Sequence, residues 1–212
     1  MIDNPLSPEL ALARLQRGNA RFVAGWPDHP DQSARRRQEV AGGQHPYAAI
    51  LTCADSRVPP EIIFDTGLGN LFVIRVAGNI VAPSQIGSVE FAAAQFSTRL
   101  VVVLGHTQCG AITATLDELR RPTKNQSPNL HSIVDRVRPS VEGLLQSGVW
   151  KDTDELVQQA VRANVRASAN QLRHGSQILE QLIDQEGLLV VGAEYSLETG
   201  IVDFFDGTQN ED

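Results

Sequence analysis

The chain has 212 residues, of which 42% are hydrophobic and 20% charged, and this composition is typical of one globular domain with a single core. Its formal net charge of -7 leaves no basic surface for nucleic acid or an anionic membrane, so neither is an expected partner. Its apolar runs are too short to span a bilayer and no signal segment opens the chain, so we expect a cytoplasmic protein.

The N-terminal part of the chain predicts two helices. The first begins at Ser7 and ends before Gly25, and the second lies at 33–43. The apolar positions of the first helix form a narrow stripe that fits a partner subunit as readily as its own core: Leu12, Leu15 and Phe22. We expect the N-terminal helices, at about 7–43, to pack on a partner subunit.

Three continuous apolar runs predict strands that are buried on both faces of a parallel sheet: 47–52, 71–76 and 100–104. A helix that begins at Pro83 separates the second strand from the third. A fourth strand at 188–191 precedes a hairpin turn into a strand at 202–205. The expected fold is α/β, a single domain over residues 1–212 with a mostly parallel central β-sheet flanked by helices.

The region between the third and fourth strands predicts helices. The first opens at Gly110, and a polar connection at 121–128 separates it from a long helical stretch that we expect Pro139 to interrupt. A capped helix follows at 152–172, and a last helix reaches Ile183.

Both cysteines of the chain lie at the ends of predicted buried strands. Cys53 follows the first strand, and His106 and Cys109 follow the third. The carboxyl ends of parallel strands meet at one edge of the sheet, where α/β proteins bind ligands. Two thiolates and an imidazole suit zinc, and three protein ligands leave the fourth tetrahedral position open for catalysis. We predict one zinc ion per chain, bound by Cys53, His106 and Cys109.

Asp55 and Arg57 come directly after the first of these cysteines. If the chain continues as an extended strand, alternation places Cys53, Asp55 and Arg57 on one side. Arg57 can then hold Asp55 ionised, and Asp55 can accept the hydrogen bond of a zinc-bound hydroxide. We predict that both residues are catalytic. An alternative role for Asp55 is that of a fourth zinc ligand in a closed state.

With both motifs in this order, the chain resembles the β-class carbonic anhydrases from about residue 7 to residue 206. The resemblance implies zinc-dependent, reversible hydration of carbon dioxide to bicarbonate and a proton, by attack of zinc-bound hydroxide. It also implies a homodimer or homotetramer. The implied substrate pocket, to which a neighbouring subunit contributes, contains Gln44, Phe72, Ala77 and Phe91. Phe91 stands where a tyrosine is frequent in the family.

Two alternatives to this activity stay open. The same scaffold could hydrolyse carbonyl sulfide or carbon disulfide, because the same hydroxide attack would serve. The chain could also be a zinc-binding protein without catalysis, although Asp55 and Arg57 beside the ligands argue against it.

Overall fold

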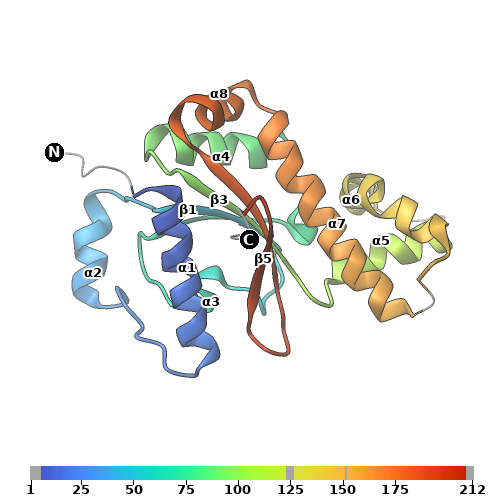
Figure 1. The fold of residues 1–212 in the computed structure, drawn as a ribbon, viewed down its shortest axis with the longest axis horizontal. Helices are drawn as coiled ribbons and strands as arrows, with labels where there is room; N and C mark the ends of the chain where they lie inside the picture. Colours follow the sequence, from blue (N-terminus) through green and yellow to red (C-terminus); the bar gives the residue numbers. More distant parts are fainter. Residues whose placement is uncertain (1–5, 123–126, 151, 209–212) are drawn as a thin grey trace.

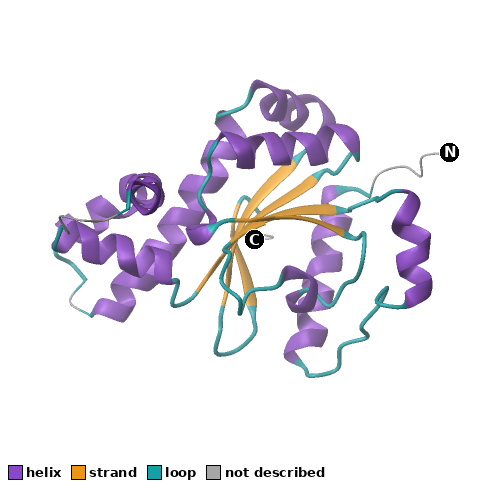
Figure 2. Ribbon diagram, turned by 180° about the vertical axis from the view of Figure 1, so that it is seen from behind, coloured by secondary structure: helices purple, strands orange, loops and turns teal. Residues whose placement is uncertain are grey.

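The computed structural model describes residues 6–122, 127–150 and 152–208. Within these residues the centre is a five-stranded sheet in the order β2-β1-β3-β4-β5 (Figures 1 and 2). The strands are β1 (Ala48–Thr52), β2 (Leu71–Arg75), β3 (Leu100–His106), β4 (Leu189–Tyr195) and β5 (Val202–Asp206). Strand β1 pairs in parallel with β2 and β3, β3 pairs in parallel with β4, and β5 is antiparallel to β4. The predicted α/β fold with a mostly parallel sheet is confirmed.

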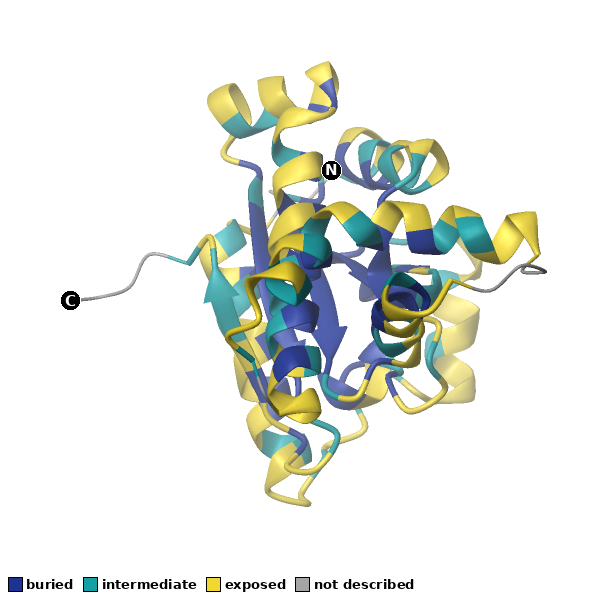
Figure 3. Cartoon of the chain, turned by 90° about the vertical axis from the view of Figure 1, so that its right-hand side faces the viewer, coloured by how far each residue is buried: buried dark blue, intermediate teal, exposed yellow. Residues whose placement is uncertain are grey.

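The central strands β1 and β3 form the buried middle of the sheet. Every residue of both strands is buried, and Figure 3 shows the strands in dark blue. Most side chains in both strands are apolar, as expected where helices cover both faces of a sheet: β1 contains Ala, Ile and Leu, and β3 is mainly Val and Leu. Thr52 of β1 is in register with Leu104 of β3. The segments that follow these two strands therefore leave the sheet at the same edge.

Helices cover both faces of this sheet. On one face lie α1 (Pro8–Val23) and the single turn α3 (Pro60–Ile63), which no sequence periodicity predicted. On the other face lie α4 (Pro83–Gln95), α7 (Thr153–His174) and α8 (Gln177–Glu186). None of the helices in the described part of the chain is long and apolar enough to cross a membrane.

A further group of helices lies beyond the carboxyl ends of β1 and β3. Helices α5 (Gly110–Arg120) and α6 (Pro128–Ser147) pack there against α7, on the right in Figure 1. Their shared apolar cluster includes Ile112, Val137 and Val161, and it also includes Cys53 and Cys109. The two cysteines therefore lie where the sheet meets this helical group.

The predicted interruption at Pro139 is wrong, because α6 continues through this residue. Val134, Val137 and Val141 lie on both sides of the proline and are buried. Burial of an aliphatic side chain contributes about 1.5–3 kcal/mol, so three of them outweigh the roughly 3 kcal/mol cost of a proline inside a helix. Residues 123–126 of the predicted polar connection lie outside the described residues.

The N-terminal segment forms α1, then α2 (Ala34–Glu39) and the short 3-10 helix η1 (Val40–Gly42). Ala11 and Leu15 of α1 are fully buried in this chain's own core. Gly18 lets α1 lie against α3, because a Cβ atom there would come within 1.9 Å of the Phe64 carbonyl oxygen. Helix α2 buries no residue. The apolar stripe of α1 therefore packs against the sheet of its own chain. Contact of the N-terminal segment with a partner subunit stays a prediction.

Candidate metal centre

Cys53 follows β1 directly and is 4% exposed. The end of the strand is fixed by Thr52, whose Oγ1 donates a hydrogen bond to the Leu104 carbonyl oxygen at 2.9 Å. The Cys53 sulfur accepts a hydrogen bond from the backbone N–H of Gly78 at 3.4 Å. Gly78 belongs to the 3-10 turn η2 (Ala77–Asn79), which follows β2. This sulfur thus lies in a buried position with a backbone donor directed at it.

His106 is the last residue of β3 and is fully buried. Its Nδ1 atom lies 2.8 Å from the Thr107 carbonyl oxygen. A carbonyl oxygen only accepts, so Nδ1 carries the proton and Nε2 keeps a free lone pair. Nε2 is buried and has no hydrogen-bond partner within the described chain. A buried ring nitrogen with a fixed tautomer and a free lone pair is what metal coordination requires.

Cys109 is the N-cap residue of α5. Its sulfur is 4.0 Å from that of Cys53, and the two sulfurs and a ring nitrogen of His106 all lie within 4.8 Å of one another. The hydrogen bond between the sulfurs is the main reason why the pKa of Cys53 is lowered and that of Cys109 is raised. Two thiolates at this distance repel each other, and a divalent cation between them favours both as thiolates.

Asp55 and Arg57 form a pair beside these ligands, but the predicted extended continuation of β1 is wrong. The chain turns after Asp55, because the Val58 N–H donates to the Asp55 carbonyl oxygen at 3.1 Å. The Arg57 N–H also donates to Asp55 Oδ1 at 2.9 Å. An aspartate side chain that binds the backbone two residues later favours such a turn over a strand.

The side chains of Asp55 and Arg57 meet through two further hydrogen bonds. Arg57 Nε donates to Oδ1 at 2.9 Å, and Nη2 donates to Oδ2 at 2.8 Å. These hydrogen bonds hold the pKa of Asp55 well below its usual value, although partial burial opposes the shift. Asp55 Oδ2 lies 3.9 Å from His106 Nε2. An ionised carboxylate therefore lies beside the free lone pair of the histidine.

Sequence reasoning missed two residues that hold this arrangement. Arg75, at the end of β2, donates from Nε to the Cys53 carbonyl oxygen at 3.1 Å and from Nη2 to that of Asp55 at 2.5 Å. Gly78 supplies the N–H on the Cys53 sulfur. An arginine that ends an apolar strand was the available signal for Arg75. Gly78 gave none, because a glycine after a strand usually marks only a turn.

The four residues assigned to the substrate pocket separate into two groups. Ala77 immediately precedes Gly78 and so lies next to the ligands. Phe72 is in register with Ala49, four residues before Cys53, which puts it about 13 Å from the ligands along the sheet. Its ring packs with that of Phe91, which is 51% exposed. Gln44 precedes β1 and so lies beyond its opposite end.

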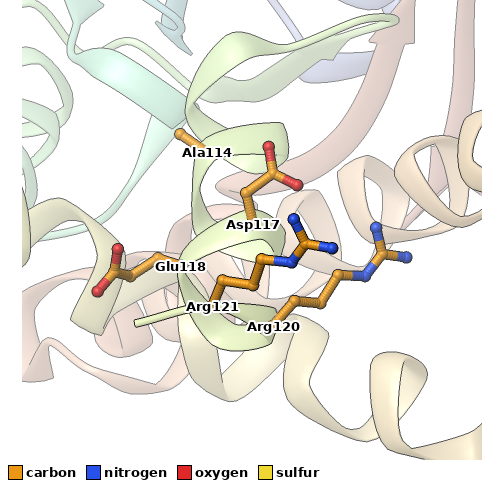
Figure 4. A pocket seen from close by; sticks show the side chains of 5 residues that line it. All are labelled: Ala114, Asp117, Glu118, Arg120 and Arg121. Atoms are coloured by element: carbon orange, nitrogen blue, oxygen red, sulfur yellow. The ribbon is translucent and has the colours of Figure 1, made fainter. Parts of the chain in front are cut away.

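A surface hollow of about 630 Å³ lies elsewhere, on the last turns of α5 (Figure 4). It is lined by Ala114, Asp117, Glu118, Arg120 and Arg121. Asp117 comes eight residues after Cys109, which is about 12 Å along the helix. The hollow is therefore separate from the metal ligands.

The sequence profile described as carbonic anhydrase matches residues 48–202. Carbonic anhydrase 2 of Mycobacterium tuberculosis is 40% identical over 194 residues, which cover 92% of this chain and 91% of that protein. The chain belongs to the carbonic anhydrase family. The carbonic anhydrase of Mycolicibacterium smegmatis is 39% identical over 199 residues, with 93% of each chain covered. The crystal structure of the β-carbonic anhydrase CafA of Aspergillus fumigatus matches with a TM-score of 0.73 at 25% identity, covering 96% of this chain and 92% of that one.

Family membership confirms the predicted resemblance to the β-class carbonic anhydrases and indicates the reaction of the site at Cys53, His106 and Cys109. The chain is a carbonic anhydrase, an enzyme that interconverts carbon dioxide and bicarbonate. The β-carbonic anhydrases are zinc enzymes, and the buried donor set of Cys53, His106 and Cys109 fits that metal.

Proposed function

We propose that Cys53, His106 and Cys109 hold one zinc ion per chain and that this centre carries out the reversible hydration of carbon dioxide. The observation that carries the proposal is the buried Nε2 of His106, which has no partner in the described chain and lies beside two sulfur atoms. A metal would satisfy this nitrogen and both thiolates at once. Zinc bound there would act as a Lewis acid that lowers the pKa of water and so provides a nucleophile near neutral pH.

Asp55 and Arg57 have complementary roles in this proposal. Arg57 keeps Asp55 ionised and holds both of its oxygens by hydrogen bonds. Asp55 Oδ2 keeps a free lone pair near His106 Nε2, so it can accept a hydrogen bond from water at the open position and orient that water. The same hydrogen bonds from Arg57 keep the Asp55 carboxylate from turning onto the metal as a fourth ligand. The closed state, in which Asp55 binds the metal, would require that these hydrogen bonds break.

The substrate pocket is proposed to form between two copies of the chain. Ala77 is next to the ligands of its own chain, whereas Phe72 lies about 13 Å away along the sheet and Gln44 lies beyond the other end of β1. Gln44, Phe72 and Phe91 could therefore reach a metal centre only in a neighbouring subunit. This proposal requires a homodimer or a homotetramer, and an exposed ring such as Phe91 would then become buried. The proposed location is the cytoplasm, whose reducing environment suits the free cysteines Cys53 and Cys109.

The decisive test is stopped-flow hydration of carbon dioxide on protein of measured zinc content, beside an assay of carbonyl sulfide hydrolysis. We expect hydration in proportion to bound zinc. His106→Ala should lose both zinc and activity, whereas His131→Ala is the matched control, because His131 is a partly exposed histidine that pairs with Asp135 within α6. Zinc-loaded wild-type protein that does not hydrate carbon dioxide would contradict the proposal, and faster turnover of carbonyl sulfide would favour the hydrolase alternative.

A further inference from the structure

The turn η2 contributes an N–H group to the Cys53 sulfur, but its backbone is strained. Gly78 has φ 70° and the next residue, Asn79, has φ 42°. This left-handed region suits glycine, and asparagine adopts it more readily than most other residues with a side chain, at a smaller cost. Two consecutive residues of this kind persist when the surrounding structure holds them.

Asn164 of α7 holds this turn from outside. Its Nδ2 donates a hydrogen bond to the Gly78 carbonyl oxygen at 2.8 Å. Its Oδ1 lies 3.4 Å from the hydroxyl of Ser140 in α6, which donates its shorter hydrogen bond, at 2.7 Å, to the Val137 carbonyl oxygen. Ser168, one turn further along α7, donates from Oγ to the Asn79 carbonyl oxygen at 3.1 Å. Gly78 is thus fixed at its carbonyl by Asn164, while its N–H is directed at Cys53 Sγ.

Asn164 occupies a position at which an apolar residue would be expected. It is 2% exposed and lies on the buried side of α7, between the buried Val161 and Val165. The helix itself does not require an amide there, because a leucine would fill the site without a polar group to satisfy. The hydrogen bond to Gly78 gives the buried amide a partner that touches a metal ligand.

We propose that Asn164 is a positioning residue of the metal centre, which keeps the Gly78 N–H on Cys53 Sγ and thereby sets how strongly this sulfur donates to the metal. The inference rests on the zinc site proposed above. An N–H that bonds a thiolate draws charge from the sulfur and so leaves the bound ion a stronger Lewis acid. Loss of Asn164 releases Gly78 and makes the sulfur richer in electrons.

The test replaces zinc with cobalt(II), whose thiolate-to-metal charge-transfer absorption reports on the sulfur donors. In Asn164→Ala we expect this band to move to longer wavelength and carbon dioxide hydration at pH 7 to fall about tenfold. The rise of activity with pH should also move to higher pH. Ser168→Ala is the matched control, because it removes an equivalent hydrogen bond from α7 to the next residue of the turn. It should leave the band in its wild-type position.

A second variant, Asn164→Ser, covers the case in which Asn164→Ala does not fold. Its hydroxyl can bond to the carbonyl oxygen of Ala160 in its own helix but is too short to reach Gly78, so the same band shift is expected. An unmoved band in a folded Asn164 variant would overturn the inference alone, and so would an equal shift in Ser168→Ala. Wild-type protein that binds neither cobalt nor zinc would overturn the proposed zinc site, and the inference with it.

Discussion

Cys53 and Cys109 present the same atom to the proposed metal, but their surroundings are built in different ways. Cys109 is the N-cap of α5, and the N–H groups of Ile112 and Ala111 in the first turn of that helix favour its thiolate. Cys53 receives an N–H from Gly78, 25 residues further along the chain, and Gly78 is in turn held by Asn164, 86 residues beyond it. The support of Cys109 is local, whereas that of Cys53 comes, beside the backbone N–H of Asp55, from two distant segments.

This difference shows where the centre is sensitive to change. The first-turn N–H groups of a helix have no partner within the helix, and its regular backbone orients them, so they can bond to the Cys109 sulfur with few contacts from other elements. The Cys53 side depends on a strained turn and on side chains from other elements. The two sides should therefore respond differently to substitutions of the same kind, except where a ligand itself is removed.

Removal of either sulfur should have the largest effect on zinc binding and activity, and the effect should be the same for Cys53 and Cys109. We expect Cys53→Ala and Cys109→Ala each to lose nearly all bound zinc and all measurable hydration, because two protein ligands hold the ion poorly. Metal analysis of the purified, folded variants checks this. Full zinc occupancy in Cys109→Ala would show that these residues are not the ligands.

Substitution of the pair that follows Cys53 should reduce activity while the zinc stays bound. We expect Arg57→Ala and Asp55→Ala to lower kcat by about 100-fold or more, because the carboxylate is no longer both ionised and oriented. Stopped-flow kinetics at measured zinc content test this. Arg35→Ala is the matched control, since Arg35 forms a similar pair with Glu39 on the surface. Near-normal kinetics in Arg57→Ala would refute the assigned role.

Two glycine substitutions compare the two sides directly. Gly78→Ala should lower the free energy of unfolding by roughly 1–3 kcal/mol, because φ is 70° and the new Cβ would lie 3.1 Å from the Ala111 Cβ. Gly110→Ala, in the first turn of α5, meets nothing within 4 Å and should stabilise the protein by about 0.4–1 kcal/mol. Urea denaturation at equal zinc content measures both. Equal effects of the two substitutions would show that the surroundings of Cys53 and Cys109 do not differ in this way.

The smallest expected effect concerns pH. The hydrogen bonds from Arg57 lower the pKa of Asp55 in the folded protein, so their contribution to stability is complete above the unfolded pKa of about 3.9. That contribution is lost only as the pH falls further, through the folded pKa. The stability difference between wild type and Arg57→Met should therefore stay constant from pH 8 to pH 5. A difference that disappears within this range would show that Asp55 titrates near neutral pH.

Features that depend on near neighbours in the chain could be predicted from the amino-acid sequence. Continuous apolar runs predicted β1, β2 and β3, and capping residues predicted the start of α1 at Ser7 and of α7 at Asp152. The position of Cys53, His106 and Cys109 after buried parallel strands was enough to predict that they meet, because such strands end at one edge.

Features that depend on contacts between distant segments became visible only in the folded chain. Pro139 stays within α6 because valines on either side of it are buried, a condition that helix periodicity does not reveal. The turn after Asp55 replaces an extended strand because a side chain bonds its own backbone there. In the sequence, Asn164 looks like an ordinary polar residue of a helix. Its hydrogen bond to Gly78, which in turn donates to Cys53, exists only because folding brings α7 against η2. Local preferences act over a few residues, whereas the hydrogen bonds that orient a ligand are selected by packing across the whole domain.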